Sequence, residues 1–403
     1  MFKKMRPIYV IFNPHTTGGA GTLSMRLGKW LTTNGYETVF ICNEITDSNN
    51  YADIENSGIR AYCWEKSKIS GKLLEKYMDG EKFVFLTYNL SAFIFVERLR
   101  KHLDIEHSLL YNISNTAMKY GKSNIFKLFF KKIFLKLDEN NSLIYPSNKP
   151  IEINEKFYKI SIHNKEDKLI RLPIETSKFD YEAILKKTKT DSFKVISIAR
   201  SKFPFKGYLF GLIDDYNKIS KKYKNIKLTI VTFGEDFDKL KDYIDKLEDN
   251  VKCNINLIGQ TSYNDLKQLI KASHVNVGMG TTLLDAGIVS VPSIIAKDYT
   301  YDNSSSGFFH MNPKRLSATN EEMSTFYTYL NEIISLSEEE YIKVCKETNE
   351  VVKDLYDINN VMKKLIKIRP NKKGQILSNT ELFIYKLRYE STTVFKRIIK
   401  DFR

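Results

Sequence analysis

The sequence predicts an α/β protein of two doubly wound domains, each a parallel sheet with helices on both faces. Short apolar runs of strand length alternate with segments of helical periodicity, a pattern typical of parallel strands joined by crossover helices. This alternation occurs twice, on either side of the polar segment Glu175–Asp191. The chain of 403 residues suits two to three domains of about 150 residues each. We therefore expect two Rossmann-like domains that face a cleft.

The strands are expected at buried apolar runs, and the helices where apolar residues recur three or four positions apart. In the first domain these are the strands Ile8–Phe12, Thr38–Cys42, Phe83–Thr87, Ser108–Ile113 and Ser142–Tyr145, and the helices Leu23–Asn34 and Ser91–His102. In the second domain they are the strands Lys194–Ala199, Ile226–Thr232, Ile255–Ile258, His274–Gly278 and Pro292–Ala296, and the helices Leu209–Lys222, Phe237–Leu247, Tyr263–Ala272 and Thr282–Val289. The predicted domains are 1–175 and 176–345, followed by a basic helical tail at 346–403. Ligands of such sheets bind at the carboxyl ends of the strands.

Composition narrows the function classes. The 63 Lys and Arg residues against 48 Asp and Glu residues give a net charge of +15, which favours nucleic acid, phosphorylated small molecules or an acidic membrane surface as partners. The four cysteines lie far apart, which argues against a zinc ribbon or a disulfide framework and fits a reducing cytosol. The N-terminal apolar run is shorter than the roughly 7–15 residues of a signal peptide, and no run reaches the roughly 18 of a membrane-spanning helix. We expect a cytoplasmic protein, with any membrane contact peripheral on the inner face of the cell membrane.

Two segments combine lysines or arginines with aromatic residues. Residues 119–137 hold six lysines and no acid, and their apolar residues form one helical face. Residues 360–403 carry a net charge of +9, from twelve basic and three acidic residues. One interpretation is a membrane-facing surface built from Lys127, Phe130, Lys131 and Lys132. The alternative is that the first face covers the sheet and the tail is a solvated helix packed on the body.

A glycine-rich turn follows the first strand. Gly18 and Gly19 open the expected helix, and glycines there let a backbone approach a ligand closely while the helix N-terminus offers N–H groups to an anion. The segment has neither the GxGxxG pattern nor a Walker A lysine. We interpret it as an acceptor or phosphate loop, with a plain flexible turn as the alternative.

Two cations follow the first strand of the second domain. Arg200 stands just past the apolar run, and Lys206 lies six residues later, before Gly207 and a helix. A planar guanidinium fork and a mobile ammonium group together suit a diphosphate. The alternative is that both are solvated loop cations.

A second glycine-rich turn follows the strand that ends at Gly278. Gly280 permits a tight turn, and Thr281 and Thr282 bring hydroxyl and N–H groups to the start of a helix. Asp285 lies about one turn further on, where a carboxylate can accept hydrogen bonds from ribose hydroxyls. A helix cap with an incidental acid is the alternative.

These segments together resemble the donor domain of GT-B glycosyltransferases, nearest to the retaining family-4 type (glycosyl transferases group 1). The resemblance covers Lys194–Ala296 and rests on the ordered motifs Arg-x5-Lys-Gly, Ile-Val-Thr-Phe-Gly-Glu, Leu-Ile-Gly-Gln and Gly-Met-Gly-Thr-Thr-Leu-Leu-Asp-Ala-Gly…Val-Pro-Ser-Ile. It is thinner over the first domain, where only the strand–Gly-Gly–helix opening and the alternation match.

The resemblance implies roles for particular residues. Arg200 and Lys206 would hold the donor diphosphate and stabilise the leaving nucleotide. Asp285 would replace the family's ribose-binding glutamate. The remaining donor-site residues would border the phosphates, the sugar and the base: Gly280, Thr281, Thr282, Gly259 and Gln260.

Two positions depart from the family's pattern. The first glutamate of the usual E-x7-E falls on Val277, which puts recognition of the donor sugar in doubt. The first domain lacks the usual histidine, and Ser114 or Asn115 would stand in by hydrogen bonding. His15, His102 and His107 are expected to be surface or structural histidines.

The resemblance implies a hexosyltransferase-like enzyme that needs no metal and no cofactor, since cations and helix N-termini neutralise the leaving diphosphate. It also suggests retention at the anomeric carbon and an acceptor that enters from the first domain. The basic–aromatic segments favour a lipid-linked acceptor, hence surface polysaccharide assembly, although a soluble glycan acceptor fits as well.

Three rival functions remain at this stage. A nucleotide-sugar epimerase of the same architecture would need clustered acids and histidines, and the sequence shows no such cluster. A nucleic-acid-binding protein is suggested by charge alone, and no RNA- or DNA-binding motif occurs. A non-catalytic GT-B partner subunit fits Val277 and the missing histidine.

Overall fold

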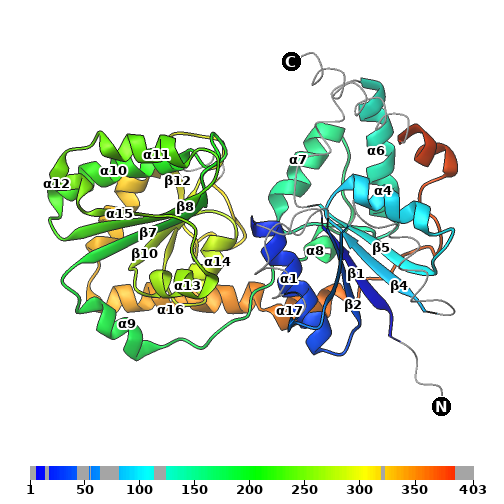
Figure 1. The fold of residues 1–403 in the computed structure, drawn as a ribbon, viewed down its shortest axis with the longest axis horizontal. Helices are drawn as coiled ribbons and strands as arrows, with labels where there is room; N and C mark the ends of the chain where they lie inside the picture. Colours follow the sequence, from blue (N-terminus) through cyan, green and yellow to red (C-terminus); the bar gives the residue numbers. More distant parts are fainter. Residues whose placement is uncertain are drawn as a thin grey trace. The chain divides into compact units, whose positions relative to one another are not determined.

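The computed structural model describes residues 6–13, 18–42, 54, 56–63, 81–112, 124–318 and 323–385. The chain forms two compact units, Met1–Arg171 with Met362–Arg403, and Leu172–Val361 (Figure 1). This division differs from the expected boundaries at 175 and 345. The segment expected as a separate tail is shared between the two units, because its start belongs to a long helix of the second unit and the chain from Met362 returns to the first.

The first unit contains a six-stranded sheet in the order β3-β2-β1-β4-β5-β6, with all strands parallel. The strands are β1 Ile8–Phe12, β2 Thr38–Cys42, β3 Arg60–Cys63, β4 Phe83–Thr87, β5 Ile105–Tyr111 and β6 Leu143–Ile144. Every residue of β1, β2 and β4 is buried, as expected for central strands covered on both faces. The expected fourth and fifth strands appear with shifted ends, and β3 was not predicted.

Helices cover this sheet. They are α1 Gly18–Thr33, α4 Leu90–Leu99, α6 Asn124–Glu139, α7 Asn148–Tyr158 and α8 Lys165–Lys168. Asn89 caps α4 by accepting a hydrogen bond from the backbone N–H of Ala92. The apolar face of α6 lies in the core beside α7, as the alternative interpretation of residues 119–137 expected: Phe130, Ile133, Phe134 and Leu137 are buried.

The C-terminal chain packs on the first unit. Leu377, Leu382 and Tyr385 are buried in the same core as α6. The fully buried carboxylate of Glu97, on α4, accepts hydrogen bonds from the backbone N–H groups of Ile376 at 2.7 Å and Leu377 at 3.4 Å. Residues 379–385 are helical and form the red helix in Figure 1. This part of the expected tail is therefore packed on the body, as the alternative interpretation of the tail expected.

The second unit contains a seven-stranded sheet in the order β13-β12-β11-β10-β7-β8-β9. The parallel strands are β7 Phe193–Arg200, β8 Ile226–Phe233, β9 Ile255–Ile258, β10 Val275–Gly278 and β11 Ser293–Ala296. All five were predicted, with ends that differ by at most one residue. Two antiparallel strands that were not predicted, β12 Ser304–Phe308 and β13 Ser324–Thr325, extend one edge.

Helices lie on both faces of this sheet (Figure 1). One face carries α10 Tyr208–Lys222, α11 Phe237–Asp245, α12 Asp249–Lys252 and α15 Phe326–Ile334, and the other carries α9 Tyr181–Thr188, α13 Tyr263–Lys271, α14 Thr281–Gly287 and α16 Glu338–Tyr356. The chain continues into α17 Ile358–Leu365. Helix α9 lies inside the segment that the sequence marked as a polar divider. None of the described helices is long and apolar enough to cross a membrane.

Candidate functional site

The predicted donor residues of the second unit follow the carboxyl ends of its parallel strands. Arg200 ends β7, Gly259 and Gln260 follow β9, and the turn at Gly280 follows β10. Because these strands are parallel and share one sheet, their carboxyl ends meet at one edge. The topology therefore brings together residues that are up to 85 positions apart in the sequence, from Arg200 to Asp285.

Arg200 lies exposed at the end of β7, and its guanidinium carbon lies 5.9 Å from the ring centroid of Phe233, at the end of β8. The next residue, Ser201, donates its backbone N–H to the Phe233 carbonyl at 2.8 Å. Gly234 has a φ of +132°, and a Cβ there would lie 2.7 Å from the Ser201 carbonyl oxygen. The loops after β7 and β8 are thus held tightly together, which presents Arg200 at a rigid strand end.

Lys206 stands six residues later in the same loop. Its ammonium nitrogen lies 4.8 Å from the ring centroid of Phe205. Burial lowers the pKa of Lys206 to about 8, and the nearby Asp298 carboxylate opposes that shift. A phosphate that binds beside this ammonium group would favour its charged form and oppose the effect of burial.

The turn after β10 has the geometry that its glycines predicted. Gly280 adopts φ +72° and ψ −135° directly before α14, a conformation that favours glycine. The Thr282 hydroxyl donates to the Met279 carbonyl at 3.1 Å, so it closes the turn from within. A Cβ on Gly278 would lie 2.7 Å from that hydroxyl oxygen. Thr282 thus has a structural role in this turn, and Thr281 begins the helix.

Asp285 is held in place by a residue that the sequence analysis missed. Its side chain is only 8% exposed, and the Tyr263 hydroxyl donates a hydrogen bond to Asp285 Oδ1 at 3.1 Å. Tyr263 begins α13, directly after Ser262, whose side chain caps that helix. The capping serine marked the helix start, but nothing local linked Tyr263 to a carboxylate 22 residues away.

Gly259 and Gln260 are exposed at the end of β9. A Cβ on Gly259 would meet no heavy atom within 4 Å, so this strand end faces open space. Val277, where the resemblance expects an acid, is fully buried in the core of the second unit. Its carbonyl accepts a hydrogen bond from the Ser197 hydroxyl at 2.7 Å.

Three groups of predicted residues in the first unit have different outcomes. Gly18 and Gly19 form the first turn of α1, and Ser114 and Asn115 lie outside the described residues. Phe130 was placed on a membrane surface, but it is 1% exposed because it faces the core. Among the α6 residues whose burial is described, the large apolar side chain that is exposed is Leu128, at 67%.

The described part of the chain offers few candidate metal ligands or catalytic histidines. It contains no group of three or more His, Cys, Asp or Glu side chains that could hold a metal ion. His107 is buried in the first unit, and its ring lies 3.3 Å from the Ser142 hydroxyl, in a structural environment. The acids Asp214 and Asp215 lie inside α10, and Asp215 accepts a hydrogen bond from the Tyr327 backbone N–H at 2.9 Å.

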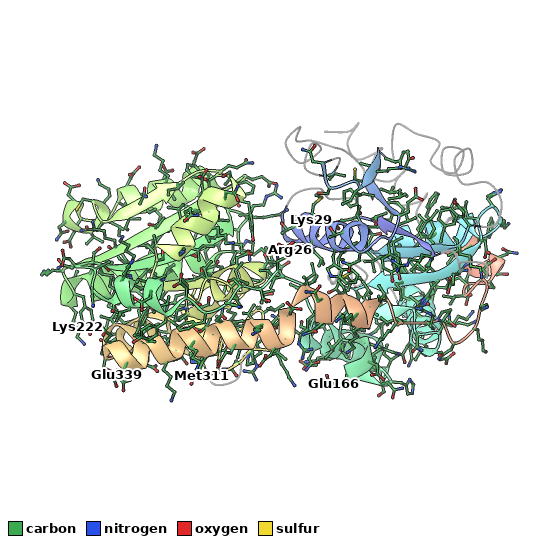
Figure 2. The ribbon with its side chains drawn as sticks, turned by 90° about the horizontal axis from the view of Figure 1, so that it is seen from below. Arg26, Lys29, Glu166, Lys222, Met311 and Glu339 are labelled. Atoms are coloured by element: carbon green, nitrogen blue, oxygen red, sulfur yellow. The ribbon has the colours of Figure 1, made fainter. Side chains whose placement is uncertain are left out.

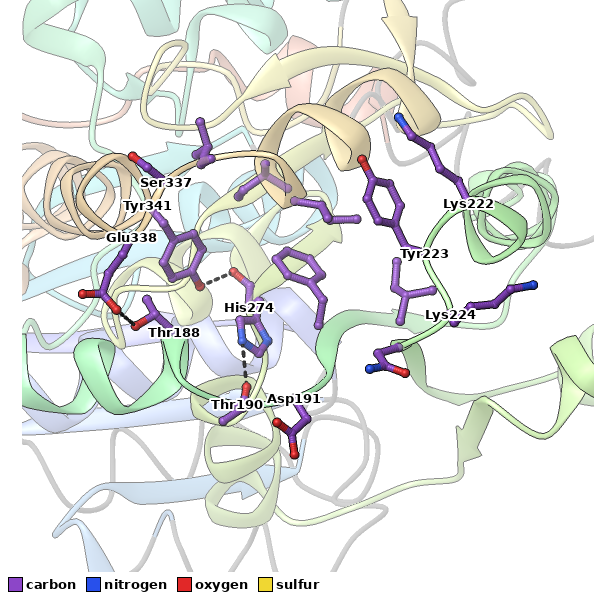
Figure 3. A pocket seen from close by; sticks show the side chains of 16 residues that line it. Thr188, Thr190, Asp191, Lys222, Tyr223, Lys224, His274, Ser337, Glu338 and Tyr341 are labelled. Carbon is purple, nitrogen blue, oxygen red and sulfur yellow. Dashed lines mark hydrogen bonds between the residues drawn. The ribbon is translucent and has the colours of Figure 1, made fainter.

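A cavity of about 500 Å³ lies at the opposite, amino-terminal edge of the second sheet (Figure 3). Lys222 and Glu339 mark this end of the unit in Figure 2. The polar side chains of the cavity bind one another: Thr188 donates to Glu338 at 2.7 Å, and the Thr190 hydroxyl lies 3.2 Å from His274 Nε2. Burial lowers the pKa of His274 to about 4, so this ring is neutral at physiological pH. We assign the cavity a structural role and place the candidate site at the carboxyl edge.

No protein-family model and no curated protein matches the chain. Solved structures do match over nearly the whole length. A glycosyltransferase from Rickettsia africae aligns with a TM-score of 0.59 at 15% identity, covering 90% of this chain and 97% of that one. Anabaena HepE in complex with UDP-glucose aligns with a TM-score of 0.61 at 13% identity, covering 90% and 99%. Sucrose-phosphate synthase from Thermosynechococcus elongatus aligns with a TM-score of 0.60 at 14% identity, covering 90% of this chain and 98% of that one.

These likenesses show the fold. The chain has two Rossmann-like α/β units of the kind found in GT-B glycosyltransferases, as the strand and motif order predicted.

Proposed function

We propose that this protein is a glycosyltransferase that moves a sugar from a nucleotide-sugar donor to a glycan or lipid-linked acceptor. One observation carries the proposal: within a GT-B fold, Arg200 ends β7, Lys206 lies in the loop that follows it, and the turn that leads to Asp285 follows the neighbouring strand β10. The complex of the structural neighbour HepE with UDP-glucose supports a nucleotide-sugar as the donor.

Arg200 and Lys206 would bind the diphosphate and stabilise the charge that builds on it as the glycosidic bond breaks. Preorganised positive charge at a developing phosphate is a large catalytic contribution, and it needs no bound metal. The pKa of Lys206, lowered to about 8 by burial, rises again when a phosphate approaches. We therefore propose a metal-independent reaction, with retention at the anomeric carbon as the family-4 resemblance implies.

Asp285 would select the nucleoside. A carboxylate accepts hydrogen bonds, and the two ribose hydroxyls can donate them. The Tyr263 hydroxyl fixes one carboxylate oxygen at 3.1 Å, which preorganises the acid for this contact. Gly259 and Gln260, which border open space after β9, would lie near the base.

The acceptor part of the proposal rests on the surface of the first unit. Helix α6 exposes Leu128 between Lys127, Lys131 and Lys132, and the neighbouring C-terminal helix exposes Phe383 at 58%. The two helices are joined by ion pairs from Lys132 and Lys136 to Glu381, at 3.7 and 2.7 Å. Basic and apolar side chains in one place suit the interface of an anionic membrane, so we propose a lipid-linked acceptor in surface polysaccharide assembly.

A second candidate is a GT-B subunit that binds a nucleotide-sugar without turning it over. The buried Val277 favours it, since this position offers no carboxylate to the donor sugar. Donor binding without sugar release would distinguish this candidate from the transferase.

The direct test is hydrolysis of UDP-, GDP-, dTDP- and ADP-sugars by the full chain in EDTA, beside Arg200→Ala and Asp285→Ala. The matched control is Lys202→Ala, which removes an exposed cation from the same loop. We expect release from one nucleotide-sugar that survives EDTA and the control substitution, and that falls at least tenfold in the other two variants. Absence of both release and nucleotide binding across the panel would overturn the donor-site assignment.

A further inference from the structure

Aromatic side chains gather where the loops after β7 and β11 meet. Six rings from three segments contact one another in pairs: Phe203, Phe205, Phe210, Tyr243, Tyr299 and Tyr301. The ring centroids of Phe203 and Phe210 are 4.7 Å apart, and those of Phe210 and Tyr301 are 5.6 Å apart. Tyr299 and Tyr301 are nevertheless 69% and 53% exposed. The cluster therefore ends in two rings that core packing does not require.

Tyr299 is held in an uncommon backbone conformation. Its φ is +55°, in the left-handed region that a bulky residue rarely adopts. Its N–H donates to the Phe205 carbonyl at 3.2 Å, and the two ring centroids are 5.1 Å apart. Strain that presents a large ring to solvent gives no packing benefit, and such strain is concentrated at binding sites and active sites.

The loop that carries both tyrosines is rigidly seated on α10. A Cβ on Gly207 would lie 2.5 Å from the Thr300 carbonyl oxygen, and one on Gly211 would lie 2.5 Å from the Asn303 nitrogen. Asn303 also donates to both carboxylate oxygens of Asp215 at 2.9 Å. Gly207, just before α10, and Gly211, within it, thus admit the loop at close range, and a buried acid anchors it. The backbone that carries the two rings is therefore preorganised.

The position of the rings separates them from the proposed nucleoside contacts. Phe205 joins Tyr299 to Lys206, whose ammonium nitrogen lies 4.8 Å from the Phe205 ring. The rings pack over α10 and α11 on one face of the sheet, whereas Tyr263 and Asp285 belong to α13 and α14 on the other face (Figure 1). A ligand that binds on these rings would therefore contact Lys206, the cation proposed to bind the diphosphate. It would not contact Asp285, the carboxylate proposed to bind the ribose.

We propose that Tyr299 and Tyr301 form a stacking platform for a pyranose ring of the sugar substrate. The face of an aromatic ring is electron-rich and apolar, and it complements the polarised C–H groups on the flat side of a pyranose. The proposal rests on the proposed function, because it places this sugar beside the diphosphate of the donor. The pyranose belongs either to the donor or to the acceptor, and the experiment below distinguishes these sources.

The test measures binding to the full chain by saturation-transfer NMR and calorimetry. The probes are methyl β-D-glucopyranoside, methyl β-D-galactopyranoside and methyl α-D-mannopyranoside, each with and without saturating UDP, together with UDP and UDP-glucose alone. The variants are Tyr299→Ala, Tyr299→Phe and, as a matched control, Tyr181→Ala, which removes a similarly exposed tyrosine from α9. Circular dichroism and thermal melting establish that each variant is folded.

We expect Tyr299→Ala to weaken pyranose binding roughly tenfold, while Tyr299→Phe and Tyr181→Ala retain it. Loss of glycoside binding alone identifies an acceptor sugar. Loss of UDP-glucose affinity with unchanged UDP affinity identifies the donor sugar. An equal loss of UDP affinity would assign the platform to the nucleobase and overturn the proposal. Unchanged binding in Tyr299→Ala would also overturn it. So would a natural protein that binds neither the glycosides nor UDP-glucose. If the chain binds the glycosides but not UDP, that result would contradict the proposed function and leave the sugar platform standing.

Discussion

The Tyr263 hydroxyl donates a hydrogen bond to Asp285 Oδ1 at 3.1 Å, linking the first residue of α13 to the buried acid of α14. The two helices follow different strands, β9 and β10, yet they pack on the same face of the second sheet (Figure 1). This bond orients the carboxylate that we propose to bind the donor ribose, which makes Tyr263 a positioning residue.

Removing the Tyr263 hydroxyl tests whether it positions Asp285 for the donor ribose. Tyr263→Phe keeps the ring and leaves Asp285 without this donor, and a hydrogen bond of this kind contributes about 1 kcal/mol. We expect the KM for the nucleotide-sugar to rise roughly fivefold with kcat nearly unchanged, since the ribose contact is the same in the ground and transition states. Tyr181→Phe, on the distant α9, is the control. A fall in kcat at constant KM would contradict the assignment.

The pH dependence of donor binding tests Lys206. Its pKa of about 8 means that the ammonium group is charged below pH 8 and loses its charge as the pH rises through that value. We expect the affinity for a nucleoside diphosphate to fall above pH 8 in the natural protein. In Lys206→Arg the decline should disappear, because a guanidinium keeps its charge throughout this range. Calorimetry at pH 6.5, 7.5, 8.5 and 9.5 measures both curves, and identical slopes would exclude Lys206 from the phosphate site.

Substitution of the buried Glu97 tests whether its hydrogen bonds attach the C-terminal chain to the first unit. Its carboxylate binds Arg100 Nε at 2.8 Å and the backbone N–H of Ile376 at 2.7 Å, so Glu97→Ala leaves a buried cation and an amide group without this partner. Breaking a buried ion pair costs roughly 3–5 kcal/mol. We expect a markedly lower melting temperature and faster amide exchange in residues 371–385. Glu152→Ala, which removes an exposed acid from α7, should leave both unchanged.

The exposed apolar side chains of the first unit test the membrane proposal. We expect Leu128→Glu and Phe383→Glu each to reduce flotation with vesicles of phosphatidylcholine and phosphatidylglycerol by several-fold, because each substitution adds a negative charge and removes apolar area from the interface. Tyr181→Glu, on the second unit, is the control. Equal flotation of all variants would contradict the proposed membrane surface. Equally strong flotation with vesicles of pure phosphatidylcholine would contradict a preference for anionic membranes.

The sequence by itself determined most of the strands and the class of fold. A strand buried on both faces is largely apolar, so Ile8–Phe12, Thr38–Cys42 and Phe83–Thr87 could be predicted with their final bounds. The parallel order of β7 and β10 then predicted Arg200 and the glycine turn at one carboxyl edge, with Lys206 in the loop that follows β7. These features depend on local composition and on a general rule of α/β sheets, and both can be read from residues close together in the chain.

Only the tertiary structure decided how side chains are oriented where their contacts are with residues far away in the sequence. Phe130 was expected on a surface and lies in the core, because the buried side of α6 is set by α7 and by the returning residues Leu377 and Leu382. Tyr263 and Asp285 meet only once two helices pack, and Tyr299 stands exposed only because Gly207 and Gly211 admit its loop. A helix or loop of given periodicity has several ways to orient, and the free energy that selects one comes from side chains far away in the sequence.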